Sequence, residues 1–143
     1  MKLRVVLLAA VAAMAAMASG ATLAASVDVT DTLDQSLAAA GDVQRGRGVF
    51  VAREGGHCVI CHTVAGIAPA GNVGPPLDGV GLRLTAGQIR LRIVDITRVK
   101  VDAVMPAFFR SEGLARVAPE YSGKTLLGAQ QVEDLVAFLG SLK

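Results

Sequence analysis

The sequence has few aromatic residues, no surplus of basic charge and no strand-like pattern. Its 143 residues include four Phe, one Tyr and no Trp, which leaves little aromatic volume for a core. Without Lys2 and Arg4, the 14 basic residues fall to 12 and equal the 12 acidic ones. Because no basic face with interleaved aromatic residues is present, we do not expect nucleic-acid binding. Apolar residues never alternate convincingly with polar ones after the first 25 residues, so the sequence predicts an all-α fold.

The first 25 residues are typical of an export signal. Lys2 and Arg4 are their only charges, an apolar run extends over 5–18, and small residues follow. We expect cleavage within 18–25 and therefore a location in the periplasm. If the leader were retained, 5–25 would approach the length of a membrane anchor, but polar and small residues interrupt it. Membrane anchoring is therefore not expected.

The remaining chain is predicted to consist of an N-terminal extension, 26–40, followed by one domain, 41–143. Leu33 and Leu37 lie at helical spacing in the extension. Two interpretations stay open for this segment, namely a short helix begun by Asp31 or a frayed terminus.

Three helices are predicted within the domain. The first extends over 42–53, and Gly46 in its interior costs about 1 kcal/mol relative to alanine. That cost is explained if another helix approaches closely at this glycine. A capping box formed by Thr85 and Gln88 begins the second helix, and an apolar stripe predicts the last one over 129–142.

A long stretch between the first two helices is rich in glycine and proline. This stretch, 63–84, predicts a loop, because these residues permit little regular structure. A loop of this length in a small domain is expected to wrap around something.

The most informative segment is Cys58-Val59-Ile60-Cys61-His62. Two cysteines at i and i+3 lie on one face of a helical turn, and a histidine follows at once, which is the pattern for covalent attachment of haem c. We expect Cys58 and Cys61 to bond one porphyrin and His62 to bind its iron. One haem would also supply the missing aromatic volume of the core.

Three other interpretations of the two cysteines are weaker. A structural zinc site would need His57 and a carboxylate to complete its ligands. A thioredoxin-like redox pair belongs beside alternating strands and helices, which the sequence lacks. A plain structural disulfide is the weakest of the three interpretations.

Met105 is the candidate for the second axial ligand of the iron. It is the only methionine outside the leader and lies 43 residues after His62, in a linker between predicted helices. His57 is too close to the attachment turn to reach the opposite face of the haem. The alternative is that Met105 is an ordinary core residue. A His/Met pair would close both axial positions, raise the reduction potential and favour electron transfer over substrate binding.

Four segments resemble class I cytochromes c: 41–50, 58–62, 74–79 and 133–139. The resemblance implies the class I fold, in which the first and last helices cross at Gly46. It also implies that the carbonyl of Pro75 holds the second ring nitrogen of His62. Arg83 corresponds to an arginine that reaches a haem propionate, and a solvated surface charge is the open alternative.

A narrower resemblance, to the SoxX family, covers most of the chain after the leader. It is carried by 36–37, 45–47, 79–84, 92–95, 104–110, 121–124 and 130–134, whereas Gly128 stands where similar proteins tend to have Thr. SoxX proteins are the monohaem subunits of the SoxAX cytochromes of bacterial sulfur oxidation. The resemblance implies a SoxA-like c-type cytochrome as the partner subunit.

The resemblance also implies a division of labour within that complex. SoxAX couples thiosulfate to a cysteine of the carrier SoxYZ, and the catalytic haem lies on SoxA. This chain would then have no catalytic residue and would pass electrons to a soluble cytochrome c. The insertion 108–127 offers Phe109, Arg110 and Tyr121 as candidate interface residues. Two other functions stay open, a free diffusible periplasmic carrier and a module of a membrane respiratory complex.

Overall fold

The computed structural model describes residues 31–143, and the predicted signal peptide and its cleavage window lie outside them. The described α-helices are α1 (Val43–Val51), α2 (Val80–Arg83), α3 (Ala86–Asp95) and α4 (Ala129–Ser141), with single 3-10 turns at Cys58–Ile60, Ile96–Arg98 and Pro119–Tyr121. The described part contains no strand, so the all-α prediction is confirmed. Between residues 31 and 143, no helix has the length and apolar character needed to span a membrane.

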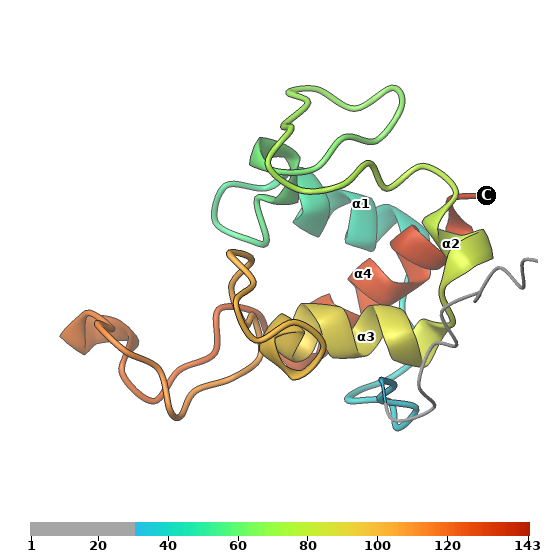
Figure 1. The fold of residues 1–143 in the computed structure, drawn as a ribbon. Helices are drawn as coiled ribbons and strands as arrows, with labels where there is room; N and C mark the ends of the chain where they lie inside the picture. Colours follow the sequence, from blue (N-terminus) through green and yellow to red (C-terminus); the bar gives the residue numbers. More distant parts are fainter. Residues whose placement is uncertain (1–30) are drawn as a thin grey trace, which may run out of the picture.

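Helices α1 and α4 cross in the centre of the domain (Figure 1). A Cβ atom on Gly46 would overlap the backbone carbonyl of Asp134 and lie 2.7 Å from Cβ of Phe138, so only glycine permits this approach. One turn further, the rings of Phe50 and Phe138 pack with centroids 5.4 Å apart at an angle of 58°. The predicted crossing at Gly46 is confirmed, and the burial it allows offsets the cost of a glycine inside a helix.

The helix starts follow local capping rules. Asp42 caps α1 by accepting a hydrogen bond from the backbone N–H of Arg45 at 2.8 Å. Thr85 and Gln88 form the predicted capping box of α3. At the start of α4, the side chain of Gln131 accepts from the backbone N–H of Gly128 at 2.8 Å. Gly128 has no side chain that could accept from the backbone N–H of Gln131, so the capping box is only half formed. Helix α1 ends earlier than predicted, because Ala52 is extended (φ −65°, ψ 130°).

Residues 26–30 of the predicted extension lie outside the described chain, and residues 31–40 are neither a helix nor a frayed terminus, so both interpretations were wrong for this part. It is an irregular strap that lies across α3 and α4. The N–H of Leu33 donates to the carbonyl of Gly87 at 3.0 Å, and the N–H of Leu37 donates to Glu133 Oε1 at 3.0 Å. The side chain of Leu37 also packs against the core. The strap is held by partners far away in sequence.

The loop predicted over 63–84 is largely irregular, but it contains the short helix α2, which was not predicted. A Cβ atom on Gly81 would overlap the carbonyl of Gly140 in α4, and the N–H of Gly81 donates to the carbonyl of Leu142 at 2.9 Å. Here glycine serves close helix packing, whereas its frequency in the sequence indicated only loop.

One hydrophobic core connects α1, α3, α4 and the cysteine turn. Its most buried side chains are Phe50, Val59, Ile89, Leu127, Val132 and Leu135. The segment between Phe108 and Leu127 leaves this body and projects from it as a long arm that contains the 3-10 turn Pro119–Tyr121 (Figure 1).

Candidate haem-attachment site

Cys58 and Cys61 lie on one turn directly after α1. The N–H groups of Cys61 and His62 both donate to the carbonyl of Cys58, at 3.1 and 2.9 Å. Both cysteines are free thiols and half-buried, and the side chain of Val59 between them is fully buried in the core. The turn is therefore anchored by Val59, and its two sulfur atoms come from the i and i+3 positions that a single porphyrin requires.

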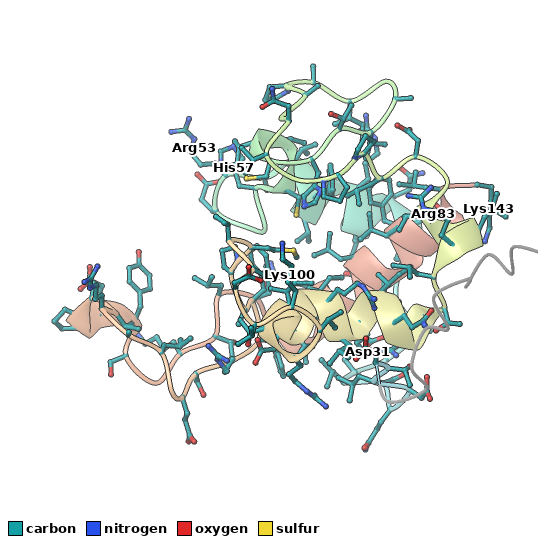
Figure 2. All side chains as sticks on the ribbon, viewed as in Figure 1. Asp31, Arg53, His57, Arg83, Lys100 and Lys143 are labelled. Carbon is teal, nitrogen blue, oxygen red and sulfur yellow. The ribbon has the colours of Figure 1, made fainter. Side chains whose placement is uncertain are left out.

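His57 enters this turn with a left-handed backbone (φ 45°, ψ 40°), which is uncommon for a residue with a side chain. Its N–H donates to the carbonyl of Ala52 at 3.1 Å. Figure 2 labels His57 and Arg53 on the segment that follows the end of α1. His57 thus shapes the approach to the cysteines.

The chain on both sides of His62 is bonded to the glycine-rich loop that follows it. The N–H groups of Gly71, Gly74 and Leu77 donate to the carbonyls of Val59, Cys61 and Thr63, at 2.9, 2.8 and 2.9 Å. The three donors and their three acceptors follow one another in the same order along the two segments. They fix the loop against the residues that carry the imidazole.

The imidazole of His62 is oriented by this loop. Its Nδ1 lies 2.8 Å from the carbonyl oxygen of Pro75, the contact that the resemblance implied. Because a carbonyl only accepts, Nδ1 carries the proton and Nε2 presents a lone pair. A Cβ atom on Gly74 would overlap the imidazole ring, so this glycine leaves the space that the ring occupies. His62 is thus prepared to bind a metal through Nε2.

Asp78 and Arg83 brace the same loop. Asp78 Oδ1 accepts from the backbone N–H of Ala65 at 2.8 Å, which ties the loop to the segment after His62. Arg83 Nη1 donates to the carbonyl of Asp78 at 2.6 Å, and its exposed guanidinium lies at the end of α2 (Figure 2). The propionate contact of Arg83 stays a prediction.

Met105 lies in the irregular segment between α3 and the arm. After it, the N–H groups of Phe108 and Phe109 donate to the carbonyls of Ile93 and Val94, at 3.1 and 3.2 Å, and so attach this segment to the end of α3. Met105 is half-buried and packs against the same hydrophobic core as Cys58. Met105, which is far from the cysteines in sequence, and the attachment turn therefore border the same hydrophobic core.

The donor chemistry of these residues fits a covalently held haem. Two free thiols, an imidazole with Nε2 available and one thioether are the groups that haem c attachment and His/Met ligation use. A zinc site is not supported, because residues 31–143 contain no group of three or more His, Cys, Asp or Glu that could hold a metal ion. Burial raises the pKa of the Cys58 thiol to about 12, so without a bound partner this sulfur is a protonated thiol at neutral pH.

Residues 43–143 match the model of the cytochrome c family, and the chain therefore belongs to this family. Membership implies covalently bound haem c. The chain is also similar to a solved structure described as "Crystal structure of SoxXA from P. pantotrophus", with 34% sequence identity and a TM-score of 0.73. That similarity covers 80% of this chain and 92% of the other chain. A search of curated proteins found no match.

Three positions that support His62 were not assigned these roles from the sequence. Gly71 and Gly74 were noted only as loop-forming or motif residues, and Asp78 was not singled out. For Gly71, a Cβ atom would overlap the backbone of Ile60. The available signal was the spacing of the glycines around Pro75, but spacing alone does not identify the segment against which a loop packs.

Proposed function

We propose that this chain is the monohaem, electron-transferring subunit of a SoxAX-type cytochrome. The observation that carries the proposal is the 34% identity to a chain of SoxXA across 92% of that chain, together with the cytochrome c family match. The two comparisons cover the described domain almost entirely. The family match alone would support a free diffusible carrier equally well, and the likeness to SoxXA favours the subunit.

In this proposal, Cys58 and Cys61 would hold the porphyrin as thioethers, and His62 Nε2 and Met105 Sδ would bind the iron. The whole sequence contains only two cysteines, which supports a single attached haem. When bound, the haem supplies a centre that accepts and releases one electron at a time. Because His62 and Met105 would both bind the iron, thiosulfate would not bind here.

The partner subunit would perform the chemistry. A cysteine thiol of SoxYZ and thiosulfate form a sulfur–sulfur bond, and one proton and two electrons are released. This chain would receive the electrons one by one and deliver them to a soluble cytochrome c. We assign no nucleophile, acid or base to it. The export signal predicted over 1–25 supports a periplasmic location.

The test is coexpression with a SoxA-type subunit in a host that attaches haem c in its periplasm. We expect a heterodimer in which the haem of this chain becomes reduced after addition of thiosulfate and SoxYZ. A haem-loaded chain that remains monomeric, and exchanges electrons without the partner, would instead establish the free carrier. In the same preparation, Met105→Ala should open the iron to carbon monoxide. An unchanged spectrum of that variant would refute Met105 ligation.

A further inference from the structure

Exposed apolar side chains are concentrated in one part of the described chain. Of the ten large hydrophobic residues that are exposed in the described chain, six lie between residues 101 and 126. These six are Val101, Val104, Leu114, Val117, Tyr121 and Leu126, and we call the last five the apolar face, because they line one groove or directly precede Met105, which lines it. Val101 and Val104 are 87% and 86% exposed, which is unusual for valine unless another surface covers it.

Four members of the apolar face lie on the arm, which is hydrogen-bonded to the body at its base. The N–H of Leu127 donates to the carbonyl of Phe108 at 2.9 Å and closes the base. Within the described structure, residues 111–124 make no hydrogen bond to the body. Their bonds stay inside the arm, as between the N–H of Tyr121 and the carbonyl of Ala118 at 2.9 Å. The arm projects from the body (Figure 1), and little in the domain itself explains its length.

The apolar face adjoins the candidate iron ligand. Leu114, Val117, Tyr121 and Leu126 line one open groove together with Met105. Val104 directly precedes Met105 in the chain and is exposed beside it. A protein bound over the arm would therefore also lie next to the Met105 side of the site.

The charge of the arm indicates which kind of partner fits. At the base, Arg110 is already paired with Asp95 at 2.8 Å. The other ionic residues of the arm cancel: Arg116 and Lys124 against Glu112 and Glu120. Encounters between mobile redox proteins are small and depend on opposite charges, whereas lasting subunit contacts are larger and more apolar. A neutral, apolar arm fits a lasting subunit contact.

We infer that the apolar face is the docking surface for the SoxA-type subunit, a role that rests on the proposed function. The partner would present an apolar, weakly charged surface that covers the arm and the residues around Met105. Of the three interface candidates taken from the sequence, Tyr121 is 57% exposed and lies on this face. Phe109 and Arg110 are partly buried at the base of the arm, where they support it.

The test measures binding of the haem-loaded chain to a purified SoxA-type subunit by calorimetry. Val117→Glu and Tyr121→Glu place a charge on the arm without disturbing the core. We expect each to weaken binding at least tenfold, which is about 1.4 kcal/mol. Leu82→Glu is the matched control, because Leu82 is 73% exposed on α2 and lies outside the apolar face, and it should bind like the unaltered chain. The absorbance spectrum of each variant checks that the haem site is intact.

The outcomes separate the two proposals. If the unaltered chain binds the SoxA-type subunit and both arm variants bind equally well, the docking surface is refuted and the proposed function stands. If the unaltered chain does not bind at all, the proposed function fails as well. If the unaltered chain forms a dimer with itself, and the arm variants are monomers, the face joins two copies and the partner named here is wrong.

Discussion

The carbonyl oxygen of Pro75 lies 2.8 Å from Nδ1 of His62, and hydrogen bonds on both sides of this pair hold the two segments in register. A donor bond from Nδ1 increases the basicity of Nε2, so it strengthens the donation of the imidazole to a bound metal. Residues that hold Pro75 in place therefore influence the metal site without touching it.

Asp78 is expected to act on His62 in this way. Asp78→Ala removes the acceptor for the N–H of Ala65, 2.8 Å away, and should loosen the Pro75 loop. A weaker bond at Nδ1 reduces imidazole basicity, so the reduction potential of the haem should rise. Because the contact is exposed, unfolding stability should fall by only about 0.5 kcal/mol. Redox titration checks the potential. Asp78→Asn keeps an acceptor oxygen and should behave like the unaltered chain; an equal shift in both variants would contradict the positioning role.

Gly46 and Gly48, both in α1, provide a test of the helix crossing and its matched control. A Cβ at Gly46 would overlap the carbonyl of Asp134, whereas a Cβ at Gly48 would meet no atom within 4 Å. Gly46→Ala should therefore destabilise the domain by about 3 kcal/mol, since the helices must separate. Gly48→Ala should stabilise it by about 0.5–1 kcal/mol, through the better helix propensity of alanine. Denaturant unfolding of the haem-loaded variants measures both. Equal effects at the two positions would mean that the crossing is not tight.

The features that could be predicted from the sequence are those whose pattern lies within a few neighbouring residues. The capping box at Thr85 and Gln88 is encoded within four residues, and Gly46 inside a strong helical pattern indicated a close helix crossing. The cysteine turn was predicted because attachment chemistry dictates its spacing. The contact between His62 and Pro75 came from the family resemblance, since no local pattern identifies that carbonyl.

The features that were missed depend on partners far away in the chain. The strap was not predicted, because its N–H groups at Leu33 and Leu37 bond to Gly87 and Glu133, and a short polar segment gives no sign of such partners. Helix α2 was missed for a related reason. Gly81 indicates a loop by composition, but the structure uses it for contact with α4.

The strap gives a prediction about the buried pair Arg90 and Glu133. Their side chains are 6% and 5% exposed, their atoms lie 2.8 Å apart, and Glu133 also accepts from the N–H of Leu37 at 3.0 Å. Glu133→Ala leaves a buried arginine without its partner and should cost about 3–5 kcal/mol. The amide of Leu37 should also exchange its hydrogen faster.

A double variant, Arg90→Met with Glu133→Leu, is the control for that prediction. It replaces the pair by apolar side chains and should recover most of the lost stability, because neither charge is then left buried alone. It should not restore the slow exchange at Leu37, whose acceptor is still absent. Recovery of both properties would show that Glu133 does not hold the strap.

The last prediction concerns acid stability and Asp134. The hydrogen-bonded guanidinium of Arg45 is the main cause that lowers the pKa of Asp134 to about 2, although burial of the carboxylate opposes it. Further bonds from the N–H of Asp42 and the amide of Gln130 act in the same direction as Arg45. An unfolded aspartate has a pKa near 3.9. The stabilisation is therefore complete above about pH 4 and is lost as the pH falls toward 2.

Asp134→Asn removes the charge but keeps an oxygen that can accept from Asp42. Because the side chain of Arg45 is 58% exposed and solvent screens the pair, we expect a loss of about 1–2 kcal/mol at pH 7. The loss should shrink between pH 4 and pH 2, where the unaltered chain loses the same contribution. Urea unfolding at several pH values measures this convergence. Asp102→Asn removes an exposed carboxylate instead and is the matched control at pH 7, where it should leave the free energy of unfolding within about 0.5 kcal/mol of the unaltered chain. A constant difference between Asp134→Asn and the unaltered chain down to pH 2 would mean that the carboxylate stabilises α1 and α4 through its shape rather than its charge.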